Sequence, residues 1–69
     1  ETVGEGSRLA GSTLGEQQVK TETGMTIIAV RRSGGEWVVQ PGPETGLAAG
    51  DVVLAKGTRA GADRLREYC

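Results

Sequence analysis

The sequence predicts an α+β domain in which a small mixed or antiparallel β-sheet is combined with two short helices. The chain has 69 residues, so we expect residues 1–69 to form one domain with a modest core. Three apolar runs rich in β-branched residues, each bounded by glycine or proline, are typical of strands. Short segments with helix-capping residues lie before and after these runs. The expected order is strand, helix, three strands and helix (β-α-β-β-β-α).

Two short elements are expected before the first long strand. Glu1–Val3 is a strand candidate at the end of the chain. Thr13 is followed three residues later by Glu16, which is the spacing of a capping box, so a short helix is predicted from Thr13 to about Val19. Gly24 is expected to end this connection.

Met25–Arg32, "MTIIAVRR", has the strongest strand pattern. Successive side chains of a strand point to opposite faces, which would separate two apolar sets: Met25, Ile27 and Ala29, and Thr26, Ile28 and Val30. Because both sets are mainly apolar, we expect a helix to cover one face and a partner chain to cover the other.

A hairpin is predicted after this strand. Ser33–Gly35 supplies the turn, because glycine tolerates the positive φ that such turns need. Glu36–Gln40 returns as the antiparallel partner, and Pro41 ends it because proline has no amide to donate. Trp37, in a chain without phenylalanine, is expected to be a core or interface residue.

One more strand and a helix complete the pattern. The strand is Asp51–Gly57, and Asp51 is expected to accept local amide hydrogen bonds before the strand starts. Thr58 stands at the N-cap position of a terminal helix whose main apolar contact is Leu65.

The composition excludes several classes of function. The chain has no histidine and a single cysteine, Cys69, so thiolate or imidazole metal clusters and Ser-His or Cys-His catalysis are excluded. Its carboxylates form no predictable catalytic pair, and we expect no enzymatic activity. The net charge is −1, and Trp37 and Tyr68 are the only aromatic residues, so no nucleic-acid partner is expected. No apolar run reaches the length of a membrane span, so we expect a soluble chain without direct membrane insertion.

Arg31 and Arg32 leave two interpretations open. Both stand at the hairpin end of a strand, where charged side chains keep a sheet edge from aggregating. A planar guanidinium also suits phosphate recognition. Since neighbouring side chains of a strand point in opposite directions, at most one of the two faces any given pocket.

The segment "ETGLAAGDVVLAKG" resembles the Gly-Leu-x-x-Gly-Asp-x-Ile-Leu segment of PDZ domains. This resemblance implies a module that binds peptides by strand addition. The upstream half, however, lacks the carboxylate-binding loop of PDZ domains.

A second resemblance extends over nearly the whole chain. Ordered motifs resemble the C-terminal domain of TrkA-type regulators of potassium conductance, the RCK C-terminal domain. The family reads Ser-x-x-x-Gly-x-Thr-Leu-Gly-Glu, Thr-Gly-Val-x-Ile-Ile-Ala-Ile-Arg-Arg, Trp-x-x-x-Pro-x-Pro and Gly-Asp-x-Leu-x-x-x-Gly-Thr. The matching residues, in the same order, are Ser7, Gly11, Thr13, Leu14, Gly15, Glu16, Thr23, Gly24, Ile27, Ile28, Ala29, Val30, Arg31, Arg32, Trp37, Pro41, Pro43, Gly50, Asp51, Leu54, Gly57 and Thr58.

This resemblance implies a dimeric, cytoplasmic regulatory domain of a potassium channel, a potassium uptake system or a cation/proton antiporter. Several family members bind cyclic di-AMP at the two-fold interface, so this or another nucleotide is the implied ligand, with no firmer cofactor. The family's ligand contacts would fall on Ile27, Ile28, Arg31 or Arg32, Gln40 and Pro41. Gln40 stands where the family often has asparagine, and Gln17 and Gln18 stand where it usually has leucine.

The implied partners are a second copy of the chain, a membrane transporter subunit and a small ligand. A two-fold dimer would present each arginine twice, which matches a ligand with two phosphates. The main alternative is a structural dimerisation domain that binds no ligand. A PDZ-like peptide-binding module is the further alternative.

Overall fold

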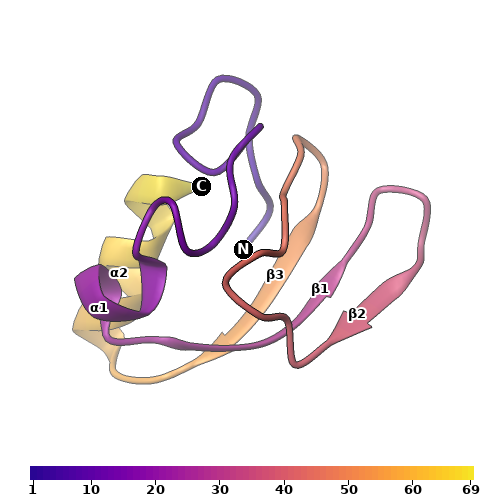
Figure 1. Cartoon of the computed structure of the whole chain (residues 1–69). Helices are drawn as coiled ribbons and strands as arrows, with labels where there is room; N and C mark the ends of the chain where they lie inside the picture. The colour runs from indigo at the N-terminus through magenta and orange to yellow at the C-terminus, as the bar shows by residue number, and fades with distance from the viewer.

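A three-stranded antiparallel sheet with strand order β2-β1-β3 forms one side of the molecule, and two helices lie together at its other side (Figure 1). The computed structural model describes residues 1–69. The elements, in chain order, are α1 (Val19–Thr23), β1 (Thr26–Arg31), β2 (Trp37–Val39), β3 (Val52–Lys56) and α2 (Arg59–Tyr68). The predicted α+β class is therefore confirmed, and the sheet is antiparallel throughout.

The predicted first strand does not form as a separate element. Thr2 makes an isolated bridge with Val52, and the amide of Val3 donates to the carbonyl of Asp51 at 2.8 Å. The observed order is therefore α-β-β-β-α. Val3 is nevertheless fully buried, because this short contact holds its side chain in the core.

The first helix begins later than predicted. The capping box does form: the amide of Thr13 donates to Glu16 at 2.8 Å, and the amide of Glu16 donates to the hydroxyl of Thr13 at 3.0 Å. The segment continues as turns, because Gln18 adopts a left-handed conformation with φ 50° that interrupts a helix. The helix α1 follows and ends at Gly24 as predicted, at φ 73°.

Strand β1 contains a bulge that changes which side chains share a face. Ile27 pairs with Ala55 and Ala29 pairs with Leu54, so Ile28 is the extra residue of β1. The strict alternation predicted for Met25–Val30 therefore fails from Ile28 onward. Val30, rather than Ala29, points into the core with Ile27.

The core lies between the inner face of the sheet and the remaining elements. Strands β1 and β3 contribute Val30 and Val53, and the helices contribute Val19 and Leu65. The nine core residues are Val3, Leu9, Leu14, Val19, Met25, Val30, Leu47, Val53 and Leu65. Many of them come from irregular segments, so the fold of this small domain depends on long loops that are themselves packed.

Helix α2 packs closely against the end of α1. Thr58 caps α2 as predicted, since its hydroxyl accepts from the amide of Gly61 at 3.0 Å. A Cβ at Gly61 would lie 2.6 Å from the carbonyl oxygen of Thr23 and 3.0 Å from the sulfur of Met25. This contact requires glycine inside α2, and the guanidinium of Arg64 adds a hydrogen bond to the Thr23 carbonyl at 3.1 Å. Neither helix is long and apolar enough to cross a membrane.

Candidate functional site

The largest hollow of the molecule is a cleft of about 460 Å³ beside α1. One wall is the segment before α1 together with α1 itself, the floor is the start of β1, and the opposite wall is the turn Pro41–Pro43. The eleven lining residues are Leu14, Gly15, Gln18, Val19, Lys20, Thr21, Thr26, Ile27, Pro41, Gly42 and Pro43. The volume is within the range of small-molecule sites, roughly 300–1,000 Å³.

Backbone hydrogen bonds hold the two walls of the cleft together at one end. The amide of Gly15 donates to the carbonyl of Pro43 at 2.8 Å, and the amide of Leu14 donates to Thr45 at 3.1 Å. A Cβ at Gly15 would lie 2.9 Å from Pro43, so the two segments approach closely only because this residue is glycine. The cleft is therefore closed at this end.

Two glutamines beside the cleft have left-handed backbones. Gln18 lines the cleft and Gln40 directly precedes Pro41, and both have φ 50°. They are the only non-glycine residues with positive φ. The amide of Gln40 donates to the carbonyl of Ile28 at 2.9 Å, which ties the turn to the bulge of β1. Non-glycine residues in this region of φ/ψ space concentrate at ligand sites, where the surrounding structure holds them in place.

The two arginines of β1 are in different environments. The Nη1 atom of Arg32 donates to Asp51 at 2.9 Å and to the carbonyl of Gly46 at 2.6 Å. The three ion pairs of the structure are Arg32–Asp51, Arg66–Glu1 and Arg66–Asp63, so Arg31 belongs to none of them. Arg31 is exposed. Arg32 is thus engaged in holding a loop, whereas the guanidinium of Arg31 is available to a ligand or partner.

Asp51 is the acceptor that fixes Arg32. It is 2% exposed and also accepts hydrogen bonds from the amides of Ser33 and Ala48, at 3.1 and 3.0 Å. Burial by itself raises the pKa of this carboxyl, but the bonds from Ala48, Arg32 and Ser33 favour the carboxylate more strongly. The net effect is a pKa below the usual aspartate value. The expectation that Asp51 accepts local amide bonds is confirmed.

The outer face of the sheet exposes several large apolar side chains. Ala29, Val39 and Leu54 are register partners, and so are Arg31 and Trp37, so their side chains share this face. We call Ala29, Arg31, Trp37, Val39 and Leu54 the open face. Trp37 is 54% exposed and Val39 is 71% exposed. The prediction of a core role for Trp37 is wrong in the single chain, whereas an interface role stays a prediction.

The predicted ligand residues divide between the cleft and the open face. Ile27 and Pro41 line the cleft, whereas Gln40, which directly precedes Pro41, does not. Ile28 is the exposed bulge residue, and Arg31 lies on the open face. Thr26 lines the cleft and Pro41 closely follows Val39, so the cleft begins where the open face ends. Arg32 lies apart from both, at Asp51.

The sequence analysis predicted no cleft and gave the other residues that line it no role in ligand binding. Lys20, Gln18, Leu14 and Pro43 line it, yet no local motif marks them as a set. The two walls lie far apart in the chain, and the backbone hydrogen bonds of Gly15 and Leu14 are among the contacts that join them. The pair Pro41 and Pro43, which frames a rigid turn, was the one available sign of the second wall.

Comparisons of the sequence with family models and of the structure with solved structures identify the same kind of domain. The family model described as "TrkA-C domain" matches residues 1–69. The RCK_C domain dimer of S. agalactiae BusR in complex with c-di-AMP superimposes with a TM-score of 0.89 and 32% sequence identity, covering 99% of this chain and 83% of that chain. No curated protein sequence matches the chain at a significant level.

Two further solved structures correct one expectation. S. agalactiae BusR in complex with its busAB-promotor DNA matches with a TM-score of 0.89, and the complex with busA-promotor DNA matches with 0.88. Both BusR chains are 32% identical to this chain over the aligned residues. Each alignment covers 99% of this chain but only 33% or 34% of the BusR chain. The expectation of no nucleic-acid partner is therefore wrong. It was based on the charge and aromatic content of 69 residues, which carry no information about the other two-thirds of such a protein.

Proposed function

Because this chain belongs to the TrkA-C domain family, we propose that it is a ligand-sensing regulatory domain that binds cyclic di-AMP as a dimer. The observation that carries the proposal is the cleft beside α1, which lies at the end of an uncovered apolar face. A monomer seldom leaves tryptophan, valine and leucine side chains of one face in water. A second copy seated on the open face would cover them and bring two clefts near one two-fold axis.

The predicted contacts can be assigned to this arrangement. Ile27 and Pro41 would contact the bases from within the cleft, together with Leu14 and Pro43. Ile28 and Gln40 lie where the cleft meets the open face. Arg31 is the arginine that we assign to the two-fold ligand, because Arg32 already donates to Asp51 and Gly46. One Arg31 from each copy would match the two phosphates of a symmetric ligand.

The output of the domain would lie in parts of the protein outside residues 1–69. The family resemblance favours a potassium or cation transporter subunit as the regulated partner. The BusR structures favour a second candidate, a regulator bound to promoter DNA. In either case regulation requires that the ligand binds one arrangement of the dimer better than another.

The proposal is tested by measuring both the binding of cyclic di-AMP and the oligomeric state of the protein. Isothermal titration calorimetry with cyclic di-AMP is expected to give one ligand per two chains, and analytical ultracentrifugation is expected to show a dimer. Free ligand at 100 times Kd stabilises the folded state by about 2.7 kcal/mol, which raises the Tm of a domain of this size by roughly 10–20 °C. A dimer that shows neither heat nor thermal shift would identify the structural dimerisation domain instead. Binding of free C-terminal peptides would identify the PDZ-like alternative.

A further inference from the structure

We propose that Lys20 is a phosphate-binding residue of the cleft, and that the proline wall opposite it takes the base. This inference rests on the proposed function and adds a specific cation to it, since Lys20 is neither a motif residue nor a neighbour of the arginine pair. It would make each cleft a site for one nucleotide unit of a two-fold ligand.

The charge distribution of the cleft points to an anionic ligand. Lys20 is the only charged residue among the eleven that line it. The chain has nine acidic residues and a net charge of −1, yet none of the nine lines the cleft. A local positive site in an acidic chain attracts anions, and an ammonium is a common point-charge partner of phosphate.

Lys20 has a fixed backbone and a free ammonium group. The carbonyl of Lys20 accepts from the amide of Gly24 at 2.8 Å, which closes the end of α1. The end of α1 is also anchored to α2. Gly61 of α2 packs against the carbonyl of Thr23, and the guanidinium of Arg64 donates a hydrogen bond to the same carbonyl. In contrast, no ion pair involves Lys20. Its ammonium is therefore available for a ligand without breaking any existing interaction.

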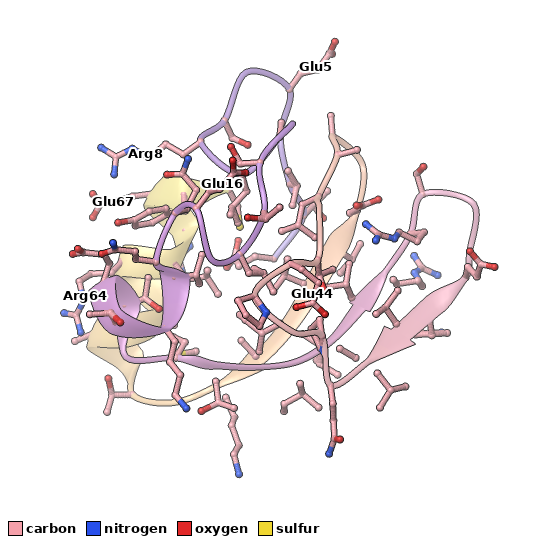
Figure 2. The ribbon with its side chains drawn as sticks, in the orientation of Figure 1. Glu5, Arg8, Glu16, Glu44, Arg64 and Glu67 are labelled. Carbon is pink, nitrogen blue, oxygen red and sulfur yellow. The ribbon has the colours of Figure 1, made fainter.

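The two walls of the cleft differ in chemistry, and this difference orients the ligand. Pro41 and Pro43 form the wall opposite Lys20, and the carboxylate of Glu44 lies against Gly42 on that side. Figure 2 shows Glu44 on the loop that faces α1 across the front of the molecule. A carboxylate repels a phosphate, whereas the proline rings offer apolar contact to a purine base. The phosphate is thus directed to Lys20, whose neighbour Thr21 also lines the cleft.

Lys56 provides a matched control. It is the register partner of Thr26 on β3, is exposed, and belongs to no ion pair. It does not line the cleft. Lys20→Gln and Lys56→Gln therefore remove the same charge from two exposed side chains, of which only Lys20 lines the cleft.

The experiment is calorimetric titration of cyclic di-AMP into the wild-type protein, Lys20→Gln, Lys20→Arg and Lys56→Gln. Loss of a charge-assisted hydrogen bond weakens binding roughly 10- to 100-fold, which we expect for Lys20→Gln. Lys56→Gln is expected to stay within about threefold of the wild type, because an exposed charge outside the site acts only through screened electrostatics. Lys20→Arg is expected to recover most of the affinity. The salt dependence of Kd should also decrease in Lys20→Gln alone.

The possible outcomes separate the two proposals. Wild-type binding with equal affinities for Lys20→Gln and Lys56→Gln overturns the role of Lys20 and leaves the proposed function standing. Absence of wild-type binding overturns the proposed function, and the role of Lys20 with it. Thermal unfolding of the free variants checks that each is folded, which we expect because the Lys20 side chain is exposed.

Discussion

The guanidinium of Arg32 donates to the buried carboxylate of Asp51 at 2.9 Å, and this pair distinguishes the two arginines of the "RR" motif. Asp51 stands at the start of β3, and Arg32 also donates to Gly46, so one side chain ties the hairpin end to the loop before β3. Arg31, the preceding residue, shares the open face with Trp37. One arginine therefore stabilises the fold, and the other is available for binding.

The first prediction concerns this division of roles. Arg32→Gln leaves the buried Asp51 without its cation and is expected to lower the free energy of unfolding by about 1–3 kcal/mol. Arg31→Gln is expected to change stability by less than about 0.5 kcal/mol, because exposed substitutions usually do. It should nevertheless weaken cyclic di-AMP binding. Urea unfolding and calorimetry of both variants provide the measurements, and equal destabilisation by the two would contradict the assignment.

The second prediction concerns the pH dependence of stability. The pKa of Asp51 is lower in the folded protein than its ordinary value of 3.8. Below this ordinary value the unfolded chain binds more protons than the folded one, so stability rises with pH there. The contribution of Asp51 is thus complete above about pH 5 and is lost as the pH falls below about 4.

Asp51→Asn tests this contribution. The variant should be less stable than the wild type near neutral pH, and the difference should shrink as the pH is lowered through the acidic range. Urea unfolding as a function of pH gives the comparison. A constant difference at all pH values would show that the charge of Asp51 contributes nothing.

The third prediction concerns Gly61 in α2. Helix propensity by itself favours alanine over glycine by about 1 kcal/mol. The added Cβ, however, would lie 2.6 Å from the Thr23 carbonyl oxygen, so we expect Gly61→Ala to destabilise the protein by about 1–3 kcal/mol. Gly34→Ala is the control, because a Cβ there meets nothing within 4 Å. Thermal unfolding decides the sign, and a stabilised Gly61→Ala would refute the close contact of α1 and α2.

The fourth prediction concerns the open face. Val39→Lys places a charge on the open face that we assign to the dimer, and should convert the dimer to a monomer in sedimentation equilibrium. Glu5→Lys is the control, since Glu5 projects from the N-terminal loop on the far side of the molecule (Figure 2). Trp37 fluorescence should shift to longer wavelength as the interface is lost. If Val39→Lys remains a dimer, the second copy binds elsewhere.

Much of the fold followed from local patterns. The three strands were predicted to within about one residue at each end, the hairpin was placed at Ser33–Gly35, and the N-cap at Thr58 was correct. These features depend on β-branched runs, glycine turns and capping residues, which act over a few neighbouring positions. The first helix was misplaced because the left-handed backbone of Gln18 is imposed by the packed loop and has no sequence signature.

The sequence alone determined the α+β class, the family resemblance and the rule that Arg31 and Arg32 point in opposite directions. The tertiary structure decided which of the two is free, because the bulge at Ile28 shifts the faces of β1 and places Arg32 beside Asp51. It also decided the composition of the cleft. Lys20 and Pro43 stand far apart in the chain, and the hydrogen bonds and core packing between the segments that carry them bring them to one site. Local propensity acts along the chain, whereas a binding site is made by contacts across it.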